Sequence, residues 1–137
     1  MTGYLLDTHI LIWLMTDNGK LNKNIREDIE YFQYAYYVSV ETLREIVILQ
    51  INKKIELKLD DVISYLQRFQ VCIIDIETDH IKELEKTPML NIAGKTHEDP
   101  FDRMLIAQAI TNKLTIISAD RKFPFYKNCG LKLLTNE

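Results

Sequence analysis

Four acidic residues stand at positions where a folded domain usually has an apolar side chain or a simple helix cap. Asp7 ends the apolar run 4–6, and Asp120 follows closely on the apolar run 114–117. Glu45 and Asp102 each interrupt apolar segments with helical spacing. Buried like charges repel one another and lose hydration, so they persist only where something positive holds them together. A divalent cation would do so, which points towards phosphate chemistry.

Each acid also has an ordinary structural explanation when taken alone. Asp7 is suited to cap the segment after it, and Asp120 to form a turn. Glu45 could face solvent or pair with Arg44. In the segment Asp99-Pro100, proline suits a first helical position, which makes Asp99 the natural N-cap and places Asp102 in the first turn, where an acid complements the exposed amides. The four explanations together are less satisfactory than any one of them.

Helical geometry places two of the acids on apolar faces. At 100° per residue, Asp102 lies at the centre of the stripe formed by residues 105, 106, 109 and 110. Glu45 is surrounded by Leu43 and residues 46–49, and a helix that is apolar nearly all round is expected to be buried. Glu41, one turn earlier, is interpreted as an acid that stabilises the helix dipole.

The composition is that of an ordinary globular protein. The 137 residues are 47% apolar and 27% charged, and they are expected to form one domain, 1–137. A net charge of −3 argues against a protein that coats nucleic acid, but not against an enzyme that grips phosphate locally. Cys72 is expected to be a buried thiol, and the composition suits a cytoplasmic protein without a membrane segment.

Short apolar runs alternate with helix-patterned segments, which predicts an α/β fold with a central, mainly parallel sheet of about five strands flanked by helices. The strands are expected at 3–6, 36–39, 71–75, 115–117 and 131–134, and the helices at 8–15, 22–33, 40–50, 60–68, 78–85 and 100–112. Residues 86–98 are expected to form a long loop. Ligands bind at the carboxyl ends of parallel strands, so Asp7 and Asp120 are expected at the same edge.

Four stretches in this order resemble the PIN-domain ribonucleases, specifically VapC-type toxins of toxin–antitoxin pairs. They are 5–13, 38–46, 97–109 and 116–120. The first and third are the more specific. Leu43 and Arg44 stand before the glutamate where an aromatic residue is common, and Ser118 stands where threonine is common. The serine still offers a hydroxyl that could orient a carboxylate or water.

The resemblance implies a three-layer PIN-like fold and a metal-dependent endoribonuclease. It implies that Asp7, Glu45, Asp102 and Asp120 are the catalytic and metal-binding acids, with Asp99 auxiliary. It also implies Mg²⁺ or Mn²⁺ as the metal, RNA as substrate, a cognate antitoxin and a homodimer. A groove for the antitoxin could be lined by aromatic residues, namely Trp13, Tyr31, Phe32, Tyr34, Tyr36 and Tyr37.

Several nearby groups could assist phosphate chemistry. The candidates for contact with RNA phosphates are Arg103, Arg121, Lys122 and Lys95. His9 and His97 are possible acid–base groups, but activation of water by a metal requires neither, and His9 is expected to pack in the core.

Two alternative functions stay open. A phosphatase of the haloacid-dehalogenase type would need an aspartate where His9 stands. A non-catalytic PIN-like module that binds RNA or protein would be expected to lack one or more of the four acids. The sequence contains no GxGxxG, GxxxxGK[ST] or GxSxG motif, which disfavours nucleotide enzymes and serine hydrolases.

Overall fold

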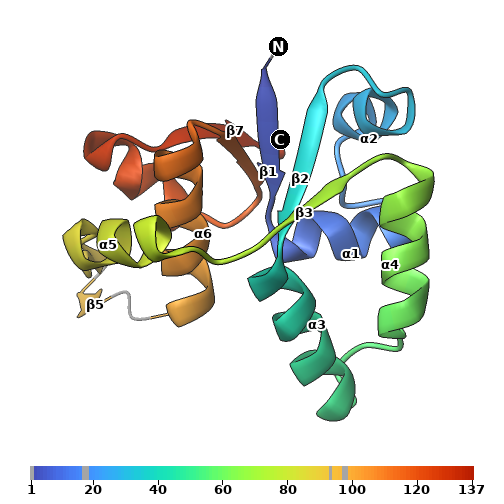
Figure 1. Cartoon of the computed structure of the whole chain (residues 1–137), viewed down its shortest axis with the longest axis horizontal. Coiled ribbons are helices and arrows are strands. Elements are labelled where there is room, and N and C mark those ends of the chain that lie inside the picture. Colours follow the sequence, from blue (N-terminus) through green and yellow to red (C-terminus); the bar gives the residue numbers. More distant parts are fainter. Residues whose placement is uncertain (1, 17–18, 93, 97–98) are drawn as a thin grey trace.

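A five-stranded parallel sheet forms the centre of the computed structural model, which describes residues 2–16, 19–92, 94–96 and 99–137 (Figure 1). The strand order is β3-β2-β1-β6-β7. In register, Leu5 of β1 lies opposite Tyr37 of β2 and Ile116 of β6. The strands are β1 (Gly3–Leu6), β2 (Ala35–Ser39), β3 (Cys72–Ile74), β6 (Thr115–Ser118) and β7 (Lys132–Thr135). The predicted parallel α/β sheet is confirmed.

Helices cover the two faces of this sheet and complete three layers. In Figure 1, α1, α2 and α4 lie on one side, while α5 and α6 lie on the other. Successive strand residues point to opposite faces of the sheet and so contribute to two different apolar clusters. Leu6 and Ile117 pack in one cluster, and Leu5 and Ile116 pack in the other. The helices are α1 (Thr8–Thr16), α2 (Lys23–Glu30), α3 (Val40–Ile51), α4 (Leu59–Arg68), α5 (Thr78–Lys86), α6 (Pro100–Asn112) and the 3₁₀ helix η1 (Phe123–Cys129).

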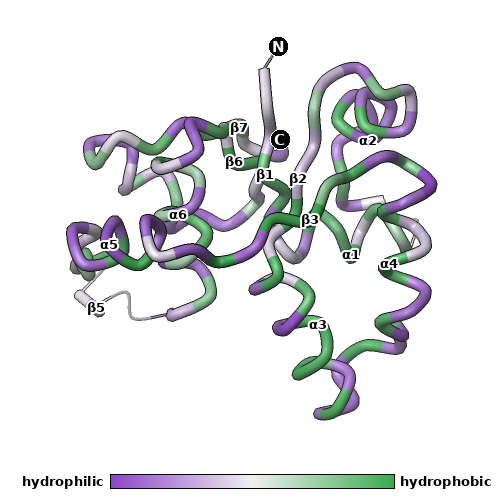
Figure 2. The backbone as a smooth tube through the Cα atoms, in the orientation of Figure 1, coloured by the Kyte–Doolittle hydropathy of each residue, from purple (hydrophilic) through white to green (hydrophobic). Residues whose placement is uncertain are grey.

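The outer helices form because each has one apolar stripe. Ile25 and Ile29 are the buried residues of α2, and Val62 and Leu66 are those of α4. This i, i+4 spacing places both members of a pair on one face. Figure 2 shows hydrophilic residues elsewhere along these helices and hydrophobic ones in the central strands.

The predictions about the burial of α3 and of Cys72 are wrong. Helix α3 is not buried all round: Ile46 is buried, but Ile48 is exposed and Ile51 is 71% exposed. Cys72 is exposed instead of buried, because β3 is an edge strand of the sheet. Periodicity alone does not reveal which helix end or which strand the fold leaves uncovered.

The segment predicted as a long loop contains further structure. Residues Asn91–Ile92 (β4) and Lys95–Thr96 (β5) pair as a short antiparallel ladder, with Gly94 at φ +82° between them. Residues 93, 97 and 98 lie outside the described part of the chain. In the parts that the structure describes, no helix has both the length and the apolar character needed to span a membrane.

Candidate active site

Asp7 and Asp120 lie at the carboxyl edge of two neighbouring strands, as the sequence predicts. Asp7 directly follows β1, and its backbone N–H donates to the carbonyl of Ile117 in β6 at 3.0 Å. Asp120 comes two residues after β6 ends. Asp7 is only 5% exposed, whereas Asp120 is half-buried. The parallel pairing of β1 with β6 therefore brings together two acids that are far apart in the chain.

Ser118 connects these two acids. Its hydroxyl donates to Oδ2 of Asp7 at 2.7 Å and accepts from the backbone N–H of Asp120 at 2.9 Å. The serine is buried, and it is the last residue of β6. The expectation that this hydroxyl orients a carboxylate is confirmed. The other oxygen of Asp7, Oδ1, accepts from the backbone N–H of Thr8 at 2.7 Å.

Glu45 approaches the site from α3 through Thr8. The Thr8 hydroxyl donates to Oε1 of Glu45 at 2.6 Å and lies 3.3 Å from the hydroxyl of Thr42. Thr8 is buried, and Glu45 is half-buried. Sequence reasoning missed Thr8 as a positioning residue. Its place directly after Asp7, as the first residue of α1, is the signal that could have identified it. Glu45 does not pair with Arg44, which contacts Glu41 instead at 3.5 Å.

Asp102 lies half-buried in the first turn of α6, and Asp99 caps this helix. Oδ1 of Asp99 accepts from the N–H groups of Phe101 at 2.9 Å and Asp102 at 3.1 Å. Pro100 occupies the first helical position, where the lack of an N–H costs nothing. The predicted cap is therefore confirmed, and it fixes the backbone from which Asp102 extends.

The pKa values show that the acids act on one another. Burial raises the pKa of Asp102 to about 8, assisted by the negative charges of Asp99, Asp7 and Asp120. Burial, with a smaller contribution from the charge of Glu45, raises the pKa of Asp7 to about 6, although hydrogen bonds from Ser118 and Thr8 and the charge of His9 oppose this shift. The site thus concentrates negative charge that its own hydrogen bonds compensate only in part.

The chemistry of these groups fits a hard divalent cation. All the donors are carboxylate oxygens, which Mg²⁺ and Mn²⁺ prefer, and a cation would relieve the repulsion that raises the two pKa values. With the side chains as they stand, no three His, Cys, Asp or Glu residues of the described ranges are arranged to hold one ion. The acids already have partners within the fold: both oxygens of Asp7 accept hydrogen bonds, Glu45 accepts from Thr8, and Asp120 lies 3.6 Å from the ammonium of Lys122.

A cavity of about 230 Å³ opens beside Asp7 and Asp120, and His9, Trp13 and Ala119 complete its lining. His9 is exposed here, so its predicted place in the core is wrong. The apolar residues Ile10 and Leu11 take the buried side of α1 and leave His9 facing outwards. His97 lies outside the described residues.

The predicted phosphate contacts differ in their surroundings. Arg121 and Lys122 are exposed beside Asp120, and Lys95 is exposed on β5. Arg103 is half-buried and donates from Nη2 to the carbonyl of Thr87 at 2.8 Å, while its Nε is buried without a hydrogen bond. Arg103 is thus held inside the fold, and the exposed cations are better placed to meet a ligand.

Similarity to known proteins agrees with this architecture. The sequence profile of the PIN domain matches residues 4–128. Comparison with curated proteins gives no match. The fold resembles a chain of VapBC2 from Rickettsia felis bound to a promoter DNA fragment, with a TM-score of 0.72, 20% identity, and coverage of 99% of this chain and 100% of that chain.

Two further solved structures have the same fold. One is DNA-bound VapBC from Salmonella typhimurium, with a TM-score of 0.70, 19% identity and 98% coverage of both chains. The other is a toxin–antitoxin complex from Klebsiella pneumoniae, with a TM-score of 0.60, 17% identity and 98% coverage of both chains. The matched residues, 4–128, extend from β1 through β6 and end before β7, and they include all four acids. The chain belongs to the PIN domain family.

Proposed function

We propose that this PIN domain is a metal-dependent endoribonuclease that acts as the toxin of a toxin–antitoxin pair. The observation that carries the proposal is the gathering of Asp7, Glu45, Asp102 and Asp120 around the carboxyl edge of β1 and β6. Asp7 and Asp102 both have pKa values raised by burial and by the charge of other acids in this group. Such perturbed carboxylates are typical of catalytic sites.

The four acids would hold Mg²⁺ or Mn²⁺. Asp7 and Asp120 would be the direct ligands, because they lie closest to the strand ends and line the same cavity. Glu45 and Asp102 would bind a second ion or orient water, and Asp99 would contribute charge while it caps α6. When bound, the ion supplies positive charge at the phosphate and activates water for in-line attack. Ser118 and Thr8 keep the Asp7 and Glu45 carboxylates in place.

An RNA strand would approach this edge through its phosphates. Arg121, Lys122 and Lys95 are exposed cations that could contact the backbone without selecting a base sequence. Lys122 also pairs with Asp120 at 3.6 Å, so it links the metal-binding acids to the expected path of the RNA. Arg103 remains a candidate, but it would first have to leave the Thr87 carbonyl.

We also propose an antitoxin partner, a homodimer and a cytoplasmic location. Similarity to chains of toxin–antitoxin complexes supports a partner. Of the aromatic residues considered for its groove, Tyr31 is 77% and Phe32 is 49% exposed, which suits contact with a partner. Tyr36 is buried, so it is not an open contact. The free thiols Cys72 and Cys129 suit a reducing compartment.

Cleavage of purified RNA tests this proposal. We expect the wild-type protein to cut a labelled single-stranded RNA in Mg²⁺ or Mn²⁺, and the Asp7→Asn variant to have no activity. Asp61→Asn is the matched control, because Asp61 is an exposed aspartate in the first turn of α4. Circular dichroism would verify that the variants are folded. Unchanged cleavage by Asp7→Asn, or equal cleavage in excess chelator, would contradict the proposal.

A further inference from the structure

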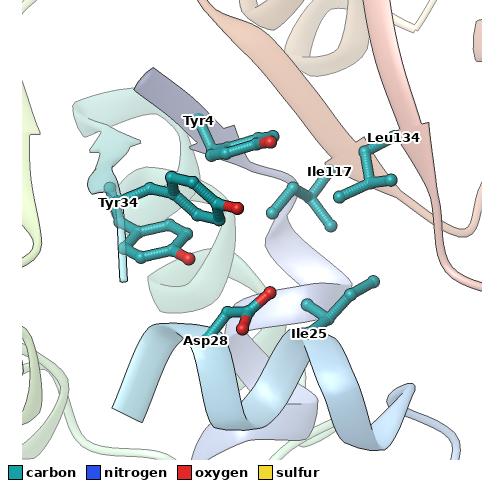
Figure 3. Close-up of a pocket in the computed structure, with 7 residues that line it drawn as sticks. Tyr4, Ile25, Asp28, Tyr34, Ile117 and Leu134 are labelled. Carbon is teal, nitrogen blue, oxygen red and sulfur yellow. The ribbon is translucent and has the colours of Figure 1, made fainter. Parts of the chain in front are cut away.

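A second cavity, of about 90 Å³, lies between α2 and the sheet, and its lining includes none of the acids of the candidate active site (Figure 3). Three tyrosines, Tyr4, Tyr34 and Tyr36, contribute to its wall together with Asp28. Ile117 and Leu134 from β6 and β7 are among the apolar residues that complete the lining. The cavity thus combines three aromatic rings and one carboxylate with apolar side chains.

The three tyrosine rings form a compact cluster. The Tyr4 and Tyr36 rings are stacked at 5.8 Å with an angle of 22° between their planes. Tyr34 meets both edge-on, at 5.4 Å from Tyr4 and 6.3 Å from Tyr36. The face of an aromatic ring carries partial negative charge and attracts a cation within about 6 Å of its centroid. When rings lie at an angle to one another, the partial negative charges of their faces can act on one bound cation from more than one side.

Asp28 adds a full negative charge to this cavity. In Figure 3 its carboxylate extends from α2 towards the space bordered by Tyr4 and Tyr34. Asp28 and Tyr36 line the same cavity, and burial, followed by the charge of Asp28, raises the pKa of the Tyr36 phenol. The Asp28 side chain is half-buried, and no hydrogen bond or ion pair connects it to another residue of the described chain. Its charge is therefore available to a ligand.

The volume of the cavity and its access from solvent limit which ligands it can bind. Pockets for drug-sized molecules measure about 300–1,000 Å³, so a cavity of about 90 Å³ suits a single headgroup and excludes a nucleotide. Tyr34 is 37% and Leu134 is 39% exposed, so the cavity can be reached from solvent along these two side chains. One carboxylate among phenol rings is too few ligands for a hard metal ion. An anion would be repelled by both the carboxylate and the ring faces.

We propose that the cavity formed by Tyr4, Tyr34, Tyr36 and Asp28 is a binding site for an organic cation, an alkylammonium or guanidinium group. The rings surround the apolar part of the headgroup, and Asp28 neutralises its charge. The same chemistry belongs to free small amines and to lysine or arginine side chains of another protein. The site acts independently of the carboxylates at the strand ends.

Titration of choline into the metal-free protein tests the proposal, with the tyrosine ring signals followed by NMR. We expect saturable shifts of the Tyr4, Tyr34 and Tyr36 signals. The neutral isostere 3,3-dimethylbutan-1-ol should bind about tenfold more weakly or not at all, because it lacks the charge that cation–π attraction requires. Asp28→Asn should weaken choline binding about three- to tenfold, and Tyr34→Leu should do the same.

Glu27→Gln is the matched control on the same helix, since Glu27 is exposed and contacts Lys23 at 3.8 Å. It should leave choline binding unchanged. The same titration is repeated with four further cations: methylguanidinium, putrescine, and the amides of N-acetyl-arginine and N-acetyl-lysine. Tighter binding of the amino-acid amides assigns the site to a protein side chain, and tighter binding of choline or putrescine assigns it to a free amine. Absence of saturable shifts with every cation, or equal binding by Asp28→Asn, would overturn the proposal, and neither result bears on RNA cleavage.

Discussion

At the scale of single residues, the carboxylates of the acidic site repel one another when they are ionised. Asp7 and Asp102 ionise less readily in the folded chain than in the unfolded one, because folding buries them near other acids. The folded state therefore binds these protons more tightly. The stability that follows from this binding is complete below the ordinary pKa of 3.8 and is lost as pH rises through about 6 for Asp7 and about 8 for Asp102.

The metal-free protein should consequently lose stability between pH 4 and pH 8. One pKa unit corresponds to about 1.4 kcal/mol, so the loss from Asp7 alone is about 3 kcal/mol. Asp102→Asn should raise the free energy of unfolding at pH 8 and have little effect at pH 4. Urea denaturation in EDTA at both pH values measures this, with Asp61→Asn as control. A variant less stable than wild type at pH 8 would show that Asp102 is compensated in the fold.

Ser118 is expected to act by positioning Asp7, to which it donates at 2.7 Å. Ser118→Ala should lower RNA cleavage about 10- to 100-fold, as is typical when a group that orients a metal ligand is removed. Ser118→Thr keeps the hydroxyl and should recover most of the activity. Cleavage rates at saturating Mn²⁺, with Mn²⁺ affinity measured alongside, distinguish positioning from general destabilisation. Equal loss in the alanine and threonine variants would contradict the role of the hydroxyl.

At the scale of elements, the site depends on the start of α6 and on the ends of two strands. Asp99 can contribute in two ways: it caps the start of α6, and its negative charge can help to bind the metal. Its Oδ1 accepts from two backbone N–H groups, so Asp99→Ala should lower the free energy of unfolding by about 1 kcal/mol. Asp99→Asn keeps the capping oxygen and should retain stability.

The same pair of variants determines whether Asp99 also serves the metal. Asparagine removes the charge and retains the cap, so Mn²⁺ affinity should fall in Asp99→Asn even where unfolding by urea is unchanged. If both stability and affinity match the wild-type protein, Asp99 is a cap only. If Asp99→Ala is as stable as wild type, the capping bonds contribute nothing to the fold.

Most elements of this fold are predictable from the sequence because their patterns are local. The run 3–6 gives β1, and Pro100 after Asp99 gives the start of α6. The exposed end of α3 and the edge position of β3 are not predictable in this way, because both depend on which elements the sheet order leaves without a neighbour. The wrong burial prediction for Cys72 has this non-local origin, whereas the exposure of His9 follows from its place on α1 beside the buried Ile10 and Leu11.

At the scale of the whole molecule, the site is the product of strand order. Asp7 and Asp120 meet because β1 and β6, more than a hundred residues apart, are neighbours in the sheet. Family resemblance and helical angles predict the four acids as one group, and their role as metal ligands stays a prediction. The hydrogen bond of Glu45 with Thr8 and the ion pair of Asp120 with Lys122 were not predictable, because side-chain partners across elements leave no periodic signal.

The central claim is that these carboxylates together bind a divalent cation, and a calorimetric titration of Mn²⁺ into metal-free protein tests it most directly. We predict saturable binding by the wild-type chain, unchanged binding by Asp61→Asn, and loss of that binding in both Asp7→Asn and Asp120→Asn. Binding that persists with wild-type affinity in both of the latter variants, or its absence from the wild-type protein, would contradict the claim.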